Sequence, residues 1–199
     1  KMRTDYRVVD SAELEKVSGA RHHEGICFVI KSPVTPSLDA LLAREGPGLL
    51  VALDGVGNPH NTGALLRSCA HFGAAAMLLG GNSKGLSGAA MRTAEGGAEH
   101  CHAIPTPNLD EAIHKAREAG YAICATSSHE GDDIYEATLP ARALLLVGEE
   151  RHGLSPERMA ASDTRLRIPG TGHIESLNVS TATGILLAEF WRQCVGPQR

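Results

Sequence analysis

Aromatic residues are scarce in this chain of 199 residues, at 4% of the total. Proteins that bind single-stranded nucleic acid without sequence preference stack bases on aromatic side chains, so we do not expect a stacking platform to be the main binding device. An excess of positive charge is also lacking, because 19 lysines and arginines are outnumbered by 23 aspartates and glutamates, for a net charge of −4. This disfavours nucleic-acid binding through a global basic field, although it does not exclude a local basic patch.

The sequence also lacks the signatures of membrane, secreted and metal-binding proteins. It has no apolar run of about 18 residues, and no signal peptide is visible in it. Its five cysteines are scattered without a Cys-x-x-Cys pair, which is typical of reduced, buried thiols, so we expect a cytoplasmic protein that does not enter the membrane. The ten histidines show no ligand spacing with cysteine partners, and we expect no metal site.

A glycine-rich segment from Asp54 to Gly63 follows a short apolar run and precedes a helical pattern. Its Gly55-Val-Gly57 start is compatible with dinucleotide binding, but His60 stands where the fingerprint requires a third glycine, and no acidic residue follows at the usual place. The chain contains no Gly-Lys-Ser/Thr, which excludes a phosphate-binding P-loop. An oxidoreductase with a nucleotide cofactor is therefore a disfavoured alternative.

Short apolar runs alternate with helical patterns from about residue 48 onward. The predicted strands are Leu49–Leu53, Ala76–Leu79, Tyr121–Ala125, Ala143–Val147 and Arg165–Ile168. The predicted helices are Thr62–Phe72, Ser87–Ala94, Leu109–Ala119, Pro156–Ala161 and Ser180–Gln193. This alternation predicts an α/β fold with a mainly parallel sheet and helices on both faces. Before it, we expect a helical turn near Ser11, a strand over Ile26–Ile30 and a short helix over Leu38–Ala43.

Ligands of such sheets bind outside the carboxyl ends of the strands, so the loops there are the candidate site. Glycines and small polar residues crowd four of them, which begin after Leu53, Ala125, Val147 and Ile168. The last loop leads into a helix. The side chains of Asn178, Ser180 and Thr181 can cap the first free amides of this helix. A bent loop entering a helix collects outward-pointing amide donors, but a well-capped helix after a Gly-Pro turn explains the local pattern equally.

Three segments rich in small and polar residues follow one another along the chain. They are Asn58-Pro-His-Asn61-Thr-Gly63-Ala-Leu-Leu-Arg67-Ser68, Val147-Gly-Glu-Glu150-Arg-His-Gly153-Leu154 and Ile168-Pro-Gly170 continuing to Ser176-Leu-Asn178-Val-Ser180. They resemble the three motifs of the SpoU branch of SPOUT RNA methyltransferases. One such motif is a weak signal, whereas three in the right order and spacing are specific. The resemblance covers roughly residues 48 to 195 and is strongest to a bacterial subgroup labelled only as tRNA/rRNA methyltransferases.

The resemblance implies a methyltransferase domain with a deep C-terminal trefoil knot, S-adenosylmethionine as cofactor and a homodimer. It implies methyl transfer to a ribose 2′-hydroxyl of tRNA or rRNA. The positions that match the family's reactive site are Arg67, Asn61, Glu150, Ser176 and Asn178. Those that match its cofactor pocket are Thr126, Gly148, Ile168 and Leu177. Arg67 is expected either to bind the phosphate beside the target ribose or to act as a base, with Glu150 orienting Arg67 or Asn61.

The N-terminal residues are similar to the end of a small RNA-binding domain that precedes the catalytic domain in some family members. We therefore expect residues 1–33 to be the remnant of that domain, 34–47 a linker and 48–199 the methyltransferase domain. About 30 residues are too few to bury an independent core, so this chain is expected to bind cofactor but to methylate RNA poorly. The alternative for residues 1–33 is a complete N-terminal extension. The alternative for the function is a catalytically weak protein that only binds RNA or cofactor.

Overall fold

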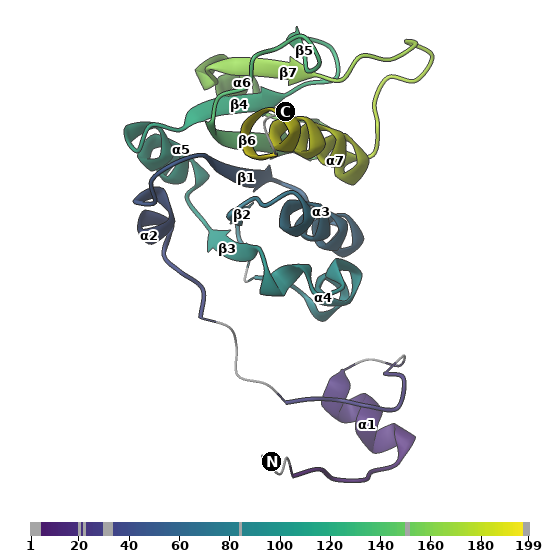
Figure 1. The fold of residues 1–199 in the computed structure, drawn as a ribbon. Coiled ribbons are helices and arrows are strands. Elements are labelled where there is room, and N and C mark those ends of the chain that lie inside the picture. The colour runs from purple at the N-terminus through teal and green to yellow at the C-terminus, as the bar shows by residue number, and fades with distance from the viewer. Residues whose placement is uncertain are drawn as a thin grey trace. The chain divides into compact units, whose positions relative to one another are not determined.

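The computed structural model of the protein describes residues 5–19, 21, 23–29, 34–83, 85–149 and 152–196. The chain divides into two compact units, Lys1–Val34 and Thr35–Arg199 (Figure 1). No helix within the described ranges is both long enough and apolar enough to cross a bilayer.

The first unit contains helix α1, Ser11–Ser18, capped by Asp10, whose carboxylate accepts a hydrogen bond from the amide of Glu13 at 2.8 Å. None of the residues of α1 is buried. The predicted strand Ile26–Ile30 is wrong for residues 26–29, which form no strand, and Ile30 lies outside the described residues. Phe28 and Val29 are 72% and 92% exposed, and the described residues of this unit form no sheet against which these apolar side chains could pair and pack.

The second unit is built on a seven-stranded sheet of order β3-β2-β1-β6-β4-β7-β5, in which all described strand pairs are parallel. The strands are β1 Gly48–Asp54, β2 Ala76–Gly80, β3 His102–Thr106, β4 Ala122–Thr126, β5 Asp132–Asp133, β6 Arg142–Gly148 and β7 Thr164–Arg167. The helices are α2 Leu38–Leu42, α3 Pro59–His71, α4 Gly88–Ala94, α5 Leu109–Glu118, α6 Pro156–Ala161 and α7 Val179–Phe190. A short 3-10 turn, η1 Gly97–Glu99, follows α4, and a π-helical segment, η2 Trp191–Val195, follows α7.

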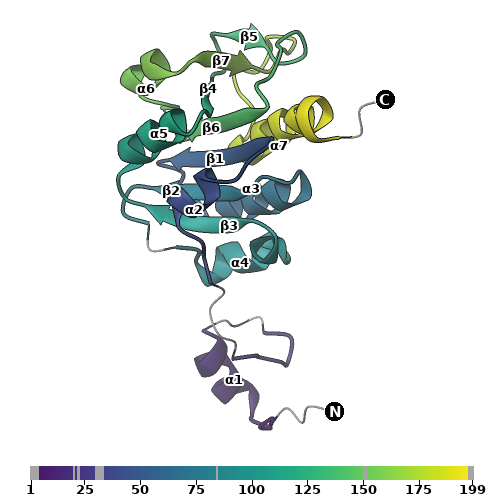
Figure 2. The ribbon, with the colours of Figure 1, turned by 60° about the vertical axis from the view of Figure 1, so that its left-hand side comes forward.

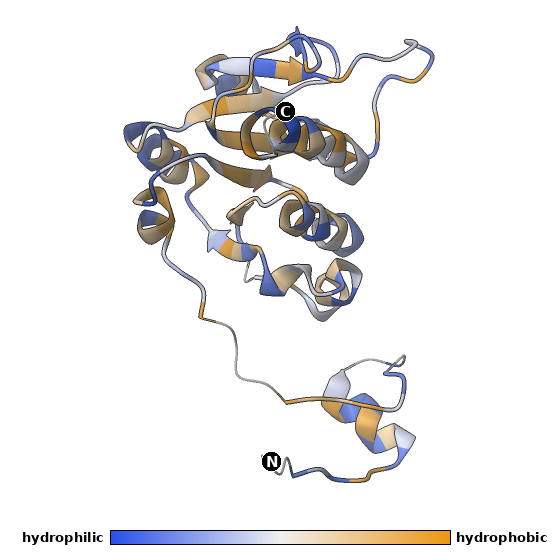
Figure 3. Cartoon of the chain, viewed as in Figure 1, coloured by the Kyte–Doolittle hydropathy of each residue, from blue (hydrophilic) through white to orange (hydrophobic). Residues whose placement is uncertain are grey.

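Side chains of the central strands alternate between two buried layers, as the pleat requires. In β1, Leu49, Val51 and Leu53 pack in the layer shared with α3, α4 and α7, whereas Leu50 and Ala52 pack in the layer shared with α2, α5 and α6. Figure 2 shows the two helical layers on either side of the sheet, and Figure 3 shows the apolar strands between them. The predicted α/β fold with helices on both faces is confirmed.

Helix α2 belongs to the second unit, although it falls in the segment predicted as a linker. Its Leu41 and Leu42 are 1% and 6% exposed within the layer that covers β1. The guanidinium of Arg142 donates to the carbonyl of Leu42 at 3.1 Å and to that of Arg44 at 2.7 Å. These contacts fasten the segment before β1 to the start of β6.

Candidate active site

All the strands end at one edge of the sheet because the sheet is parallel, and this edge carries the four glycine-rich loops. The end of β1 pairs with the end of β6 through Asp54 and Gly148, and the end of β4 pairs with β7 through Thr126 and Leu166. Thr126 and Ile168, two predicted cofactor residues, are half-buried at this edge. The strand order therefore brings segments together that are far apart in the sequence.

Two contacts tie the loop after β4 to the strand and loop of β7. The amide of Ser127 donates to the carbonyl of Leu166 at 3.0 Å. Farther along, the imidazole of His129 lies 3.3 Å from a carboxylate oxygen of Glu175. Because both side chains of this second contact are largely exposed, it orders the loops only weakly.

The loop after β6 folds back tightly upon itself. The amide of Gly153 donates to the carbonyl of Glu149 at 3.0 Å. A Cβ atom on Gly148 would lie 2.2 Å from the carbonyl carbon of Gly153, so no larger residue fits there without moving the backbone. The backbone that approaches Gly148, a predicted cofactor residue, is therefore that of its own loop. Glu150, a predicted site residue, lies outside the described residues.

Asn178 joins the third motif to the first. Its side-chain oxygen accepts hydrogen bonds from the amides of Ser180 at 2.9 Å and Thr181 at 3.4 Å, which confirms it as the cap of α7. Its side-chain amide donates to the Oδ1 atom of Asn61 on α3 at 3.2 Å. The structure thus brings together two of the five predicted reactive-site residues and explains why Asn178 needs both a donor and an acceptor.

The loop between β7 and α7 carries exposed apolar side chains beside polar ones. Ser176 is exposed, Leu177 is 49% exposed and Ile174 is 77% exposed. Apolar side chains that face solvent in a loop rich in main-chain donors and acceptors suit a ligand with a flat heteroaromatic ring. On the neighbouring helix α7, Leu187 is fully buried within the chain.

Arg67 occupies another side of α3 from Asn61. It lies one turn after Gly63, whose Cα approaches α4 so closely that a Cβ would be 2.5 Å from the carbonyl oxygen of Ala90. The Arg67 side chain is 58% exposed, and its Nη1 atom lies 2.9 Å from a carboxylate oxygen of Glu95. Glu150, expected to orient Arg67 or Asn61, lies outside the described residues, and the partner of Arg67 in the described part of the chain is Glu95. Sequence reasoning missed Glu95, and the one local pattern that could have indicated it is its position at the end of a predicted helix, directly before Gly96 and Gly97.

Arg158 on α6 fastens the far end of the β6 loop to the sheet. It forms an ion pair with Asp54 at the end of β1, and its Nε atom donates to Asp110 at 3.2 Å. Burial lowers the pKa of the guanidinium, but its hydrogen bonds to the two carboxylates outweigh this effect and raise that pKa above its ordinary value. Arg158 therefore stays charged and ties α6, which follows the loop, to the end of β1.

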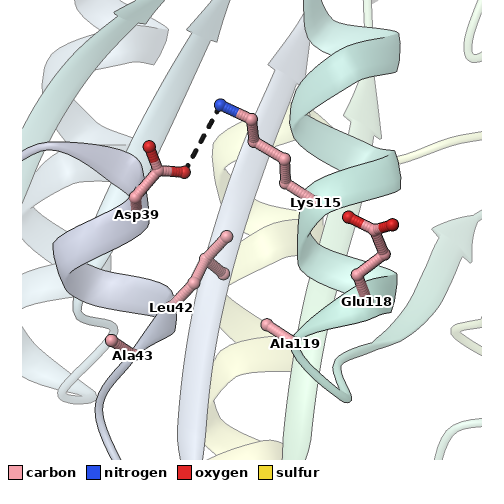
Figure 4. Close-up of a pocket in the computed structure, with 6 residues that line it drawn as sticks. All are labelled: Asp39, Leu42, Ala43, Lys115, Glu118 and Ala119. Carbon is pink, nitrogen blue, oxygen red and sulfur yellow. Dashed lines mark ion pairs between the residues drawn. The ribbon is translucent and has the colours of Figure 1, made fainter.

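The described residues contain no group of three or more histidine, cysteine or acidic side chains that could hold a metal ion. A shallow cavity of about 530 Å³ lies between α2 and α5, lined by Asp39, Leu42, Ala43, Lys115, Glu118 and Ala119 (Figure 4). The end of α5 leads into the start of β4, so this cavity lies near the amino-terminal edge of the sheet. It is separate from the loops that carry the motifs.

Comparison with known proteins identifies relatives of the whole second unit. The model of the SpoU rRNA Methylase family matches residues 48–188. The chain is 43% identical to an uncharacterised tRNA/rRNA methyltransferase, YfiF, of Escherichia coli O157:H7, over 96% of this chain and 56% of that protein. It is 36% identical to the 23S rRNA (guanosine-2′-O-)-methyltransferase RlmB of a Burkholderia species, over 92% of this chain and 76% of that protein. The chain therefore spans only about half the length of the first of these relatives.

A solved structure shares the fold. The AdoMet-bound rRNA methyltransferase of Sinorhizobium meliloti superposes with a TM-score of 0.74 and 29% sequence identity, covering 82% of this chain and 62% of that one.

Proposed function

The chain belongs to the SpoU rRNA Methylase family, and from this membership we propose that it transfers a methyl group from S-adenosylmethionine to a ribose 2′-hydroxyl of tRNA or rRNA. The 2′-O-methyltransferase activity in the name of the RlmB relative and the cofactor bound to the Sinorhizobium meliloti enzyme support this reaction and this cofactor. The observation that carries the proposal in this chain is the hydrogen bond between Asn178 and Asn61, which joins two of the family's motifs at the loop edge of the sheet.

We propose that Thr126, Gly148, Ile168 and Leu177 bind the cofactor. Thr126 and Ile168 are half-buried at the ends of neighbouring strands, and Leu177 presents an apolar side chain directly before the helix cap. Main-chain groups there suit the polar edges of adenine and ribose, while Leu177 suits the flat face of the base. Gly148 contributes by allowing the neighbouring loop to fold back.

S-adenosylmethionine supplies a methyl group on a positively charged sulfur, so the protein need only align the attack and help remove the hydroxyl proton. In the proposed reaction the ribose oxygen would bond to the methyl carbon as the bond from that carbon to sulfur breaks, and the hydroxyl proton would pass to water. Arg67 binds the phosphate beside the target ribose, because a guanidinium gives up a proton too reluctantly to serve readily as a base. Asn61, Ser176, Asn178 and Glu150 shape the site around the hydroxyl.

We further propose the family's trefoil knot and homodimer, in a cytoplasmic protein. Contacts of the segment after α7 with the chain before β6 support a threaded C-terminus. The side chain of Gln193 donates to the carbonyl of Ala137 and accepts from the amide of Leu139, both at 3.0 Å. Trp191, 39% exposed, and Val195, 52% exposed, supply an apolar surface for a second copy. Residues 1–33 are proposed to be part of an RNA-binding domain and 48–199 the catalytic domain.

Ligand-dependent melting and a transfer assay test the proposed function. A ligand that binds only the folded state raises the melting temperature, so S-adenosylhomocysteine should raise it and NAD should not. With tritiated S-adenosylmethionine and total bacterial RNA, the label should appear in RNA, and mass spectrometry of its nucleosides should find it as 2′-O-methylation. Label on a base, or a melting shift with NAD alone, would contradict the proposal.

A further inference from the structure

Glu95 stands in an unusual backbone conformation for its side chain. It ends α4 in the left-handed region, with φ 43° and ψ 56°. This region suits glycine, whereas a residue with a Cβ is strained in it. Gly96 and Gly97 follow directly, so ending the helix one residue later would have put a glycine in that position. The chain instead holds a glutamate there, and the glutamate contacts Arg67.

Close packing of α3 against α4 and the turn after it surrounds the contact between Glu95 and Arg67. At one end of the interface between α3 and α4, a Cβ on Gly63 would lie 2.6 Å from the Cβ of Thr93. At the other end, a Cβ on Gly97 would lie 3.0 Å from the Cα of Arg67 itself. Two glycines therefore let α4 and its following turn lie directly on α3, and this packing fixes the position from which Glu95 reaches Arg67.

The ion pair uses only one edge of the guanidinium. Nη1 of Arg67 lies 2.9 Å from Glu95, and within the described ranges no other group pairs with this arginine. An arginine presents five N–H donors in a planar fork, so Nε and Nη2 stay available for a second oxyanion. Both side chains are more than half exposed, and such a pair contributes little to stability. Stability alone therefore does not account for a strained glutamate at this point.

We propose that Glu95 is a positioning residue, which holds the guanidinium of Arg67 by one edge and turns its other edge toward a phosphate of the RNA substrate. This inference rests on the proposed function, in which Arg67 binds that phosphate. A preoriented guanidinium loses less freedom when the phosphate arrives, so the benefit falls mainly on the reaction step and to a smaller extent on RNA binding.

The test compares Glu95→Gln, which keeps the shape and removes the charge, with Glu95→Asp, which keeps the charge and tolerates the left-handed backbone. Glu99→Gln is the matched control, because Glu99 is exposed in the adjoining turn and has no ion pair in the described part of the chain. Glu95→Gln should lower kcat for methyl transfer about tenfold, raise the KM for RNA by no more than about threefold and leave the binding of S-adenosylhomocysteine within about twofold of wild type. Glu95→Asp should restore most of kcat, and Glu99→Gln should leave it unchanged.

Binding of radiolabelled total tRNA supplies an arm that needs no turnover. Glu95→Gln should weaken binding about threefold in the wild-type background and leave it unchanged in an Arg67→Ala background, since the glutamate acts through the arginine. If the wild-type protein binds tRNA but transfers no methyl group, the proposed function fails and this cycle alone decides the inference. Equal effects of Glu95→Gln and Glu99→Gln, or equal effects in both backgrounds, would overturn it.

Discussion

Asn178 and Asn61 are 117 positions apart in the sequence, and their side chains share a hydrogen bond of 3.2 Å. The acceptor oxygen of Asn178 caps α7, while its donor nitrogen reaches α3. One side chain therefore fixes both the start of a helix and the junction between two motifs. Its two functional groups can be removed separately, and this makes the position informative.

Replacing Asn178 by aspartate should separate stability from activity. A carboxylate still accepts from the first amides of α7 and is favourable at a helix N-terminus, so the melting temperature should stay near that of wild type. The donor to Asn61 is lost, and methyl transfer should fall at least about tenfold. Asn178→Ala should lose both properties, with a destabilisation of about 1 kcal/mol. Melting curves and the tritium assay on the same samples measure both effects, and full activity in Asn178→Asp would show that the contact is dispensable.

Arg67→Ala should abolish methyl transfer and leave cofactor binding nearly unchanged. Arg67 lies on the face of α3 that packs against α4, whereas the proposed cofactor residues lie in loops that follow β4, β6 and β7. Its pair with Glu95 is exposed, so the change in stability should stay within about 0.5 kcal/mol. Calorimetry with S-adenosylhomocysteine and the tritium assay check the two halves. Joint loss of binding and activity would assign Arg67 to the cofactor pocket instead.

Gly148→Ala should disrupt the loop after β6. The added Cβ would collide with the backbone of Gly153 and Leu154, and backbone has to move to admit it. We expect a destabilisation of about 2 kcal/mol, together with weaker binding of S-adenosylhomocysteine. Gly170→Ala is the control, because no atom lies within 4 Å of the Cβ it would gain, and it should behave like wild type. Urea unfolding and calorimetry measure the pair, and a neutral Gly148→Ala would refute this account of the loop.

The central strands could be predicted because they are buried on both faces and form short apolar runs. All five strands predicted from residue 48 onward are present, with ends shifted by one residue at most. The strands β3 and β5 escaped prediction because they lie at the two edges of the sheet: β3 is largely half-buried and contains Pro105, and β5 has two residues. Helix α3 begins at Pro59, three residues before the predicted start, because Asn58 caps it and proline suits the first turn.

The site could be predicted only as a set of segments. Motif order identified Asn61 and Asn178, but their contact depends on how α3 and α7 pack after the chain has crossed the sheet. The pair of Arg67 and Glu95 likewise depends on the close packing that Gly63 and Gly97 allow between α3 and the segment after it. A local sequence pattern does not predict this packing. Ile26, Phe28 and Val29 show the opposite case, because they form a local strand pattern but are exposed, and the described part of their unit contains no sheet.

The carboxylate of Glu189 should make stability depend on acid pH. Its side chain is 8% exposed, and Arg192 donates to it at 2.8 and 2.5 Å. The hydrogen bonds from Arg192 lower the pKa of Glu189 despite the opposing effect of burial, and Gln193 assists. Because the folded pKa is depressed, the stabilisation is fully present above the unfolded value of about 4.3 and is lost as pH falls through the folded value.

Arg192→Met should therefore destabilise the protein at neutral pH, and the difference from wild type should shrink once Glu189 is protonated. Urea unfolding at pH 7 and near pH 3 measures this. Arg67→Met, which breaks an exposed pair, should change stability by less than about 0.5 kcal/mol at either pH. A difference for Arg192→Met that persists in acid would point to lost packing.

The protein should be a dimer that uses the end of α7. An exposed tryptophan beside other apolar groups marks a contact surface, and Trp191 is 39% exposed next to the half-exposed Val195. Light scattering at micromolar concentration should give the mass of two chains. Trp191→Glu should shift the protein toward the monomer, because a charge buried in an apolar interface is costly. Tyr135→Glu, at a position 57% exposed beside β5, is the control and should leave the mass unchanged. A wild-type monomer at this concentration would contradict the dimer, and an unchanged mass for Trp191→Glu would place the interface elsewhere.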